Sequence, residues 1–250
     1  MVGWLLAAWL ACSPCGDGEM CAVEGGRYLV RTPTTGSGPH PVLMYFHGYG
    51  RSPEDVQDRK TVQPWREAGY LTVFPEGANG SWSNVGSPHT ERDELAFFEA
   101  VWQDVQERFD VESSTVVSGH SHGSSMAWDI ACYRPESVLA LAGSAGTFWV
   151  PEPVECVAPV PVRHSHGLAD RIMPMEGRPI GSAQQGDVYE GVGAWALTNG
   201  CTPKPRAPAA GGCQVWSCTR ADLRLCLHDG GHGAPAGWAG DMLEWVDTVR

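Results

Sequence analysis

The chain has 250 residues, of which 42% are apolar, and a formal net charge of −12 at pH 7. This length is sufficient for one large core, and α/β domains of this size are commonly single. The acidic balance and the lack of a basic stripe in the sequence exclude nucleic acid as an expected partner.

The chain begins with an apolar stretch, residues 1–11, that carries no charged side chain. It is too short to span a bilayer, and it resembles a secretory signal that lacks the usual basic start. Leu10-Ala11-Cys12 resembles the end of a bacterial lipobox, so lipidation of Cys12 would attach the protein to a membrane. The alternative is a longer signal cut short by a misassigned start codon. We expect an exported protein, secreted or periplasmic, with Cys12 as a candidate lipid anchor.

Nine cysteines are many for an intracellular enzyme of this size. They show no paired CxxC motifs with zinc-site spacing, so disulfides formed in an oxidising compartment explain them better. If Cys12 is lipidated, the other eight could form four bridges. Residues 12–26 are rich in Gly and Cys and are expected to form a tether, with Cys15–Cys21 as a candidate local bridge. Residues 27–250 are expected to form a single folded domain.

This domain alternates apolar strands with helical segments. Such an alternation predicts a mostly parallel sheet with helices on both faces, in which ligands bind at the carboxyl ends of the strands. The stretch 42–46 is apolar throughout, as is typical of a strand buried on both faces. The predicted strands are 27–31, 42–46, 70–74, 114–118, 137–142, 159–164 and 222–228, and the predicted helices are 53–68, 91–109, 124–132, 188–198 and 239–249.

The pentapeptide Gly119-His120-Ser121-His122-Gly123 stands between a predicted strand and a predicted helix. In that context G-x-S-x-G is typical of a nucleophile elbow, whose glycines are needed because side chains there would collide with neighbouring elements. The N-terminus of the following helix favours negative charge at the same point. Ser121 is therefore the predicted nucleophile, and the alternative is an ordinary Gly/Ser/His-rich turn.

Two other strand ends carry possible partners for Ser121. Asp170 follows the sixth predicted strand and His232 follows the seventh, which is the chain order of the triad in α/β-hydrolases. A neutral imidazole takes the serine proton, and a carboxylate fixes the tautomer of that imidazole. Asp187 and His228 are the weaker rivals, since His228 lies inside the predicted strand.

Acyl transfer also develops an oxyanion, which needs preorganised N–H donors. One donor is expected from the backbone of His122, and the other from Gly48 or Tyr49 in the loop after strand 42–46. Tyr49 could join an aromatic wall suited to a hydroxycinnamoyl group, although each of its aromatic members could equally belong to the core or rim. The remaining pocket candidates are His120, Trp82 and Trp149.

A metal site is the competing interpretation of the histidines. His120-x-His122 and His164-x-His166 both have a spacing found in metallohydrolases. No acidic residue completes a ligand set near either pair, and the serine arrangement explains more residues. We therefore expect neither a metal nor another cofactor.

These residues together resemble the secreted α/β-hydrolase esterases that include poly(3-hydroxybutyrate) depolymerases and feruloyl and acetylxylan esterases. The resemblance covers about residues 27–248. It implies the triad given above, and it implies bridges near Cys132–Cys156 and Cys201–Cys218, which would leave Cys213–Cys226. It rests on His47-Gly48-Tyr49-Gly50, Phe74-Pro75-Glu76-Gly77, the helix from Asp93 to Phe109, Gly119-His120-Ser121-His122-Gly123, Ala131-Cys132, His166-Gly167-Leu168-Ala169-Asp170, Trp195, Asn199-Gly200-Cys201 and Gly230-Gly231-His232.

The sequence thus predicts a monomeric, single-domain α/β-hydrolase, exported, with residues 27–250 as the catalytic domain. We expect it to cleave carboxylic esters of the feruloyl, acetyl or hydroxyalkanoate type, in small or polymeric substrates, through an acyl-enzyme on Ser121. One alternative is an exported serine peptidase with the same triad. A second is a catalytically silent protein of the same fold that only binds ligands.

Overall fold

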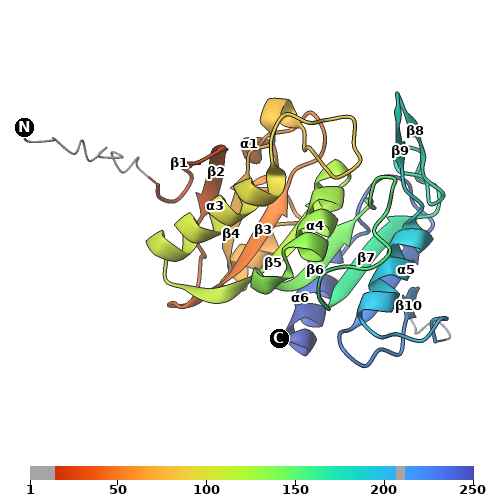
Figure 1. The fold of residues 1–250 in the computed structure, drawn as a ribbon. Coiled ribbons are helices and arrows are strands. Elements are labelled where there is room, and N and C mark those ends of the chain that lie inside the picture. The colour runs from red at the N-terminus through yellow and green to blue at the C-terminus, as the bar shows by residue number, and fades with distance from the viewer. Residues whose placement is uncertain (1–14, 207–211) are drawn as a thin grey trace, which may run out of the picture.

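The computed structural model describes residues 15–206 and 212–250, so the predictions for residues 1–11 and for Cys12 lie outside the described residues. Nine strands within the described residues form one sheet in the order β1-β2-β4-β3-β5-β6-β7-β11-β10 (Figure 1). The strands from β4 to β11 in this order are parallel, and antiparallel strands flank them at both edges. The predicted mostly parallel sheet is confirmed.

The elements follow the predicted alternation of strand and helix. None of the described helices is long and apolar enough to cross a membrane. The strands of the large sheet are β1 (Met20–Val23), β2 (Gly26–Arg31), β3 (His40–Phe46), β4 (Leu71–Pro75), β5 (Val111–His120), β6 (Val138–Ser144), β7 (Val162–Gly167), β10 (Cys213–Val215) and β11 (Leu223–His228), and the hairpin strands are β8 (Arg178–Ile180) and β9 (Ala183–Gln185). The helices are α1 (Pro53–Val56), α2 (Gln63–Glu67), α3 (Glu94–Arg108), α4 (His122–Tyr133), α5 (Val188–Thr198) and α6 (Trp238–Val249), with short 3₁₀ turns at Ala78–Gly80 and Pro135–Ser137.

The sheet divides the core into two layers because successive side chains of a strand point to opposite faces. In β3, Met44 and Phe46 pack against α3, α4 and α5, whereas Leu43 and Tyr45 pack on the side of α1, α2 and α6. Figure 1 shows α3, α4 and α5 on one face of the sheet and α6 on the other. The core is closed on both faces, so the carboxyl edge of the parallel strands remains available for a site.

The N-terminal part of the domain differs from the prediction. Residues 12–26 are not only a tether, because β1 pairs antiparallel with β2 and places Met20 opposite Leu29. Cys21 is fully buried and bonded to Cys15, which fixes this segment at the edge of the sheet. A strand of four residues within a Gly/Cys-rich stretch gives too short a pattern to be recognised.

The predicted helix 53–68 is in fact two short helices, α1 and α2, separated by residues 57–62. Pro64 explains the break, because it lacks an N–H and clashes with the preceding turn inside a helix. It is tolerated in the first turn of α2, where that N–H would have no intrahelical partner.

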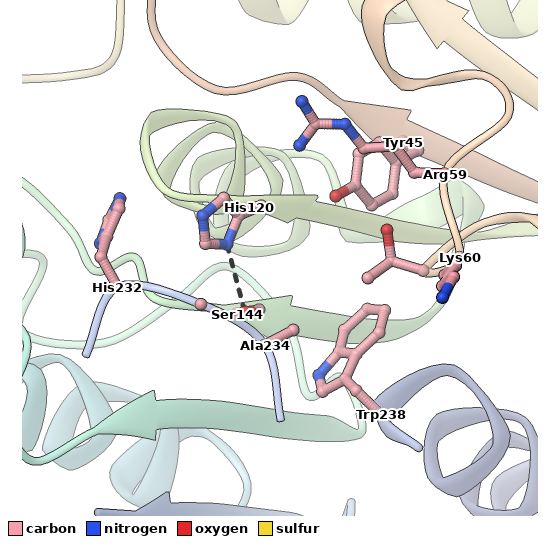
Figure 2. A pocket seen from close by; sticks show the side chains of 10 residues that line it. Tyr45, Arg59, Lys60, His120, Ser144, His232, Ala234 and Trp238 are labelled. Carbon is pink, nitrogen blue, oxygen red and sulfur yellow. Dashed lines mark hydrogen bonds between the residues drawn. The ribbon is translucent and has the colours of Figure 1, made fainter. Parts of the chain in front are cut away.

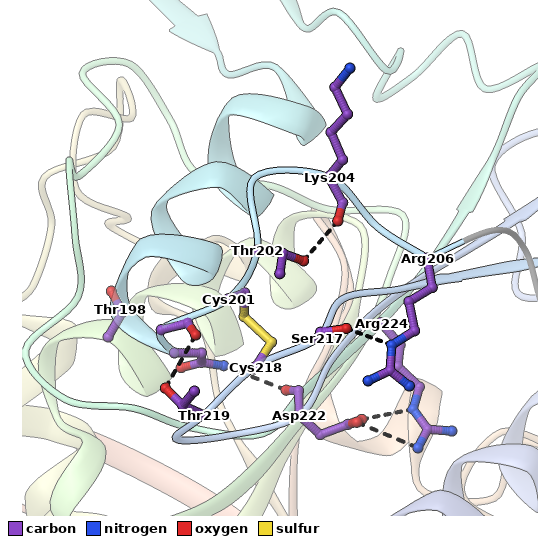
Figure 3. Close-up of a disulfide and its surroundings, with 12 residues drawn as sticks. Thr198, Cys201, Thr202, Lys204, Arg206, Ser217, Cys218, Thr219, Asp222 and Arg224 are labelled. Carbon is purple, nitrogen blue, oxygen red and sulfur yellow. Dashed lines mark hydrogen bonds and ion pairs between the residues drawn. A yellow bond between two sulfur atoms is a disulfide. The ribbon is translucent and has the colours of Figure 1, made fainter.

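Four disulfides pair the eight cysteines of the described residues as Cys15–Cys21, Cys132–Cys156, Cys201–Cys218 and Cys213–Cys226. All four predicted pairings are confirmed. Cys201–Cys218 joins the segment after α5 to the segment before β11, and Arg206 Nε donates to Ser217 Oγ across the same loops (Figure 3). Two of the disulfides therefore hold the β10–β11 edge of the sheet. His232 lies in the loop that follows β11.

Candidate active site

Ser121 lies on the turn between β5 and α4, with φ 59° and ψ −131°. A positive φ is unfavourable for a residue with a Cβ, costs about 1–3 kcal/mol, and persists only where neighbours hold it. Here the neighbours do so, because the Ser121 N–H donates to the Ser144 carbonyl oxygen at 3.0 Å and its own carbonyl oxygen accepts from the Ser124 N–H at 2.8 Å. The predicted strand, strained turn and helix are all present.

The two glycines of the elbow are required by close contact rather than by positive φ. A Cβ on Gly119 would overlap the Gly123 carbonyl, and a Cβ on Gly123 would overlap the carbonyl oxygens of Phe46 and His47. The elbow thus packs directly on the backbone at the end of β3, as the sequence predicts.

Gly123→Ala is therefore expected to lower the free energy of unfolding by about 1–3 kcal/mol or more, because backbone carbonyls cannot move aside as flexible side chains can. The measurement is urea unfolding followed by fluorescence. Gly240→Ala is the matched control, since Gly240 lies in α6 with nothing within 4 Å of an added Cβ. That change should leave stability unchanged or raise it by about 0.5–1 kcal/mol. Equal stability of the Gly123→Ala variant and the native chain would contradict the packing described.

Ser121, His232 and Asp170 are connected by two short hydrogen bonds. His232 Nε2 is 2.8 Å from Ser121 Oγ, and His232 Nδ1 is 2.7 Å from Asp170 Oδ2. An ionised carboxylate can only accept, so Nδ1 carries the proton and Nε2 is left to accept one from the serine. The three residues follow the carboxyl ends of the parallel strands β5, β7 and β11, which explains how segments distant in sequence meet.

The Asp170 carboxylate is held by its own loop. Its Oδ1 accepts from the backbone N–H groups of Ile172 at 2.8 Å and Met173 at 2.9 Å. Burial by itself would raise the pKa of Asp170, but these hydrogen bonds and the one to His232 outweigh it and hold that pKa below its ordinary value. Asp170 is thus ionised at neutral pH, as an acceptor for His232 must be.

A chain of buried side chains runs beneath this loop. Trp128 Nε1 donates to His164 Nδ1 at 3.3 Å, His164 Nε2 lies 3.1 Å from His166 Nδ1, and His166 Nε2 lies 2.7 Å from the Met173 carbonyl oxygen. Because an indole N–H can only donate, the direction of every bond in the chain is fixed, with each imidazole neutral and protonated at Nε2. Burial lowers the pKa of both histidines, which agrees with this assignment.

This series of hydrogen bonds decides whether the His164-x-His166 pair is a metal site or a structural pair. Both nitrogens of each ring are used in hydrogen bonds, so in this arrangement neither ring offers a lone pair to a metal. The chain ends at Met173, whose N–H donates to Asp170, and so supports the position of the carboxylate.

Trp82 was a predicted pocket residue, but its side chain does not line a pocket and has a structural role instead. Its side chain is fully buried against Phe46, and its Nε1 donates to the His47 carbonyl oxygen at 2.7 Å. The Trp82 carbonyl oxygen in turn lies 2.9 Å from His122 Nε2. Burial lowers the pKa of His122 to about 4, so the ring is neutral at physiological pH and donates this bond. Trp82 therefore ties the loop after β3 to the start of α4.

The two segments tied by Trp82 carry the predicted oxyanion donors. His122 is the first residue of α4, so its backbone N–H has no intrahelical partner. Gly48 lies against the elbow, with a Cβ built on it 3.6 Å from Ser121 Cβ. The loop is further held by the Gly77 N–H, which donates to His47 Nε2 at 3.0 Å. Gly48 and His122 thus flank Ser121.

No family model matches the chain. Among curated proteins, the chain is similar to the probable feruloyl esterase C of Aspergillus niger, with 24% identity over 237 residues that cover 86% of this chain and 79% of the relative. Among solved structures, the acetyl xylan esterase of Aspergillus awamori aligns with a TM-score of 0.66 and 15% identity, over 88% of this chain and 93% of that one. Native pOPH aligns with a TM-score of 0.63 and 16% identity, over 96% and 88%. The chain therefore has the α/β-hydrolase fold, and the relatives that it resembles are named esterases.

Cavities lie on both sides of the triad of this hydrolase. The first, of about 480 Å³, we call the apolar cavity. Trp149 lines it as predicted, and so does the largely exposed Tyr49. The apolar cavity is lined by Tyr49, Pro88, His89, Ser121, His122, Trp149, Ile172, Met173, Arg178, Ile180, Gly181 and Gln185.

The second cavity, of about 420 Å³, lies beside His232 and contains the predicted pocket residue His120 (Figure 2). His120 Nδ1 is 3.3 Å from Ser144 Oγ, and its ring centroid is 4.9 Å from that of His232. Burial lowers the pKa of His120 to about 4, with smaller contributions from His232 and Arg59. His120 is therefore neutral at physiological pH.

The rival residues of the hydrolase have other partners. Asp187 caps α5, where its side chain accepts from the N–H groups of Tyr189 and Glu190. His228 Nδ1 accepts from the Gly230 N–H at 3.1 Å. Asp170 and His232, rather than Asp187 and His228, form the hydrogen-bonded set with Ser121.

Asp129 is a buried polar residue of the site's frame that sequence reasoning missed. Its Oδ2 accepts from Asn84 Nδ2 at 2.9 Å and from the Val85 N–H at 3.0 Å, so it anchors the loop after β4 to α4. Burial raises the pKa of Asp129 to about 7. A single acid within an apolar helix gives no sequence signal that separates it from a surface position.

The stability of the hydrolase should therefore depend on pH through Asp129. Its pKa is raised in the folded state, so the stabilisation is complete in acid and is lost as the pH rises through about 7. The contribution to the slope is at most about 1.4 kcal/mol per pH unit. Asp129→Asn should remove it, so its free energy of unfolding should fall less between pH 5 and pH 7.5 than that of the native chain. An equal change in the free energy of unfolding between the two pH values for the variant and the native chain, measured by urea titration, would contradict this.

Proposed function

We propose that this hydrolase cleaves carboxylic esters through an acyl-enzyme on Ser121. The observation that carries the proposal is the pair of hydrogen bonds of 2.8 Å and 2.7 Å that place His232 between Ser121 and Asp170. The names of its relatives support ester chemistry, since the curated relative is a probable feruloyl esterase and a structural neighbour is an acetyl xylan esterase.

The proposed reaction has two steps. His232 Nε2 takes the Ser121 proton while Oγ attacks the ester carbonyl, and the imidazolium is stabilised by Asp170. The oxyanion accepts N–H bonds from His122 and from Gly48 or Tyr49, each worth on the order of 3 kcal/mol of barrier. The proton then passes from His232 to the alcohol oxygen as the C–O bond breaks. In the second step, water attacks the acyl-enzyme with His232 again as base, which frees the acid and restores Ser121.

The acyl group would occupy the apolar cavity. This cavity borders Ser121 and His122, the nucleophile and an oxyanion donor, but His232 is not among its lining residues. Tyr49 and Trp149 give this cavity an aromatic wall. An aromatic acyl group such as feruloyl would suit that wall.

The test is a panel of substrates at equal enzyme concentration. Methyl ferulate, acetylated xylan and poly(3-hydroxybutyrate) compare the three predicted acyl types. The ester p-nitrophenyl butyrate serves as a general ester substrate, and aminoacyl anilides test the peptidase alternative. We expect turnover of p-nitrophenyl butyrate and the highest kcat/KM for methyl ferulate. Preference for the anilides would establish the peptidase instead. Inertness toward every substrate together with no reaction with a fluorophosphonate would indicate a catalytically silent binding protein.

We further propose that the protein is exported. Four disulfides join the eight cysteines of the described residues, and such bridges form and persist in oxidising compartments. Lipid attachment at Cys12 and a monomeric state stay predictions. Mass spectrometry of the mature N-terminus and light scattering in solution test them.

A further inference from the structure

The cavity beside His232 differs from the apolar cavity in charge and in its place along the reaction. We call it the basic cavity and define it by Arg59, Lys60, His120, Ser144, His232 and Trp238 (Figure 2). Ser121 is not among its lining residues, and His232 is not among those of the apolar cavity. A third cavity of about 330 Å³ is lined by both Ser121 and His232 and also by Arg51 and Arg59. A substrate could therefore extend from the apolar cavity past the triad into the basic one.

The chemistry of the triad assigns the two ends of the substrate to the two cavities. During acylation His232 returns its proton to the oxygen of the alcohol, so the alcohol portion must lie on the His232 side. The acyl carbonyl must lie at Ser121 and the oxyanion donors, which border the apolar cavity. Under the proposed function, the basic cavity therefore takes the alcohol portion of the ester.

The charge of this region is opposite to that of the protein as a whole. The chain carries a net charge of −12, yet Arg51, Arg59 and Lys60 line the basic and third cavities, and no Asp or Glu is among their lining residues. The nearest carboxylates in sequence have other partners. Asp58 pairs with Arg31 at 3.0 Å, and Asp55 Oδ2 accepts from the Ser52 N–H at 3.0 Å.

The basic side chains that line the cavity are available to a ligand. The Arg59 Nε donates to the backbone carbonyl oxygen of Asp55 at 3.0 Å, which positions the guanidinium without neutralising its charge. The Trp238 side chain is 3% exposed, and its Nε1 has no hydrogen-bond partner among the described residues. Trp238 therefore contributes its ring to the wall of the cavity and not an accessible hydrogen-bond donor.

We propose that the alcohol portion of the substrate carries a carboxylate, as in a hydroxy acid or a uronic acid, and that Arg59 and Lys60 bind it in the basic cavity. This inference rests on the proposed function. A guanidinium matches the two oxygens of a carboxylate with parallel N–H bonds, and Lys60 adds a second positive charge. Binding of the carboxylate would place the ester oxygen at His232, and so the enzyme would favour anionic esters despite its own negative charge.

The test compares two esters with the same acyl group, 4-(butanoyloxy)butanoate and its uncharged analogue 4-(butanoyloxy)butanamide, by release of butyrate. We expect kcat/KM to be about tenfold higher for the carboxylate, a factor that corresponds to roughly 1.4 kcal/mol. The preference should shrink in about 1 M NaCl, where the Debye length is about 3 Å. Arg59→Gln combined with Lys60→Gln should bring the ratio of the two kcat/KM values close to one.

The matched control is Lys204→Gln combined with Arg220→Gln, which removes the same charge from exposed positions on the loops around Cys201–Cys218. This control variant should keep the native ratio of the two kcat/KM values. Equal kcat/KM for the two esters in the native enzyme, or turnover of p-nitrophenyl butyrate without turnover of the carboxylate ester, would overturn the inference and leave the proposed function intact. Failure to hydrolyse any of the three esters would overturn the proposed function and the inference with it.

Discussion

Ser121→Ala is expected to lower kcat for p-nitrophenyl butyrate by about 10⁴- to 10⁶-fold, the range found when a serine nucleophile is removed from a triad. The reason is that the Oγ 2.8 Å from His232 Nε2 is the atom that forms the acyl bond. A small residual rate would come from the oxyanion donors and binding alone. The measurement is steady-state turnover, together with urea unfolding to show that the fold is intact.

The same reasoning predicts the effect of replacing His232. His232→Ala should lower kcat to a similar level, and the double variant with Ser121→Ala should be little worse than either single one, because the residues act as a unit. His228→Ala is the control, since His228 Nδ1 only accepts from the Gly230 N–H. Activity of Ser121→Ala within tenfold of the native enzyme would contradict the proposed mechanism.

Asp170→Asn is expected to lower kcat by about 10⁴-fold, the loss known for the same change in a serine protease triad. The amide oxygen can still accept from the Ile172 and Met173 N–H groups, so the loop should stay in place. The amide NH₂ would then face His232 Nδ1 and force its proton onto Nε2. In that tautomer the ring cannot accept the proton of Ser121.

Asp187→Asn is the matched control for this change. Asp187 caps α5 and has no contact with the triad, so its replacement should change kcat by less than about twofold and stability by no more than about 1 kcal/mol. Equal losses of activity in the two variants would show that the carboxylate of Asp170 has no special role.

The parts of the structure that sequence predicts are those specified by local pattern. The helix Val188–Thr198 is predicted at its observed bounds, and the structure adds that the Asp187 side chain caps it. The strand, turn and helix around Ser121 were predicted because close backbone packing restricts Gly119 and Gly123 to glycine. The order of Asp170 and His232 followed from their positions after strands, which all end at one edge of a parallel sheet.

The parts that sequence could not predict depend on contacts between distant segments. Trp82 was expected in a pocket because an aromatic residue in a polar loop has the same local pattern whether it is buried or exposed. Its role appears only when its indole reaches the carbonyl of His47 and its own carbonyl meets His122. The strands β8, β9 and β10 have three residues each, too few to show an alternating pattern.

The proposed mechanism requires that Ser121 forms the covalent intermediate. It is tested most directly by treating the native enzyme with a fluorophosphonate and locating the adduct by intact-protein and peptide mass spectrometry. We expect one adduct per chain, on the peptide that contains Ser121, with complete loss of esterase activity and no adduct in Ser121→Ala. Esterase activity that survives the reagent, or an adduct located on another residue, would contradict it.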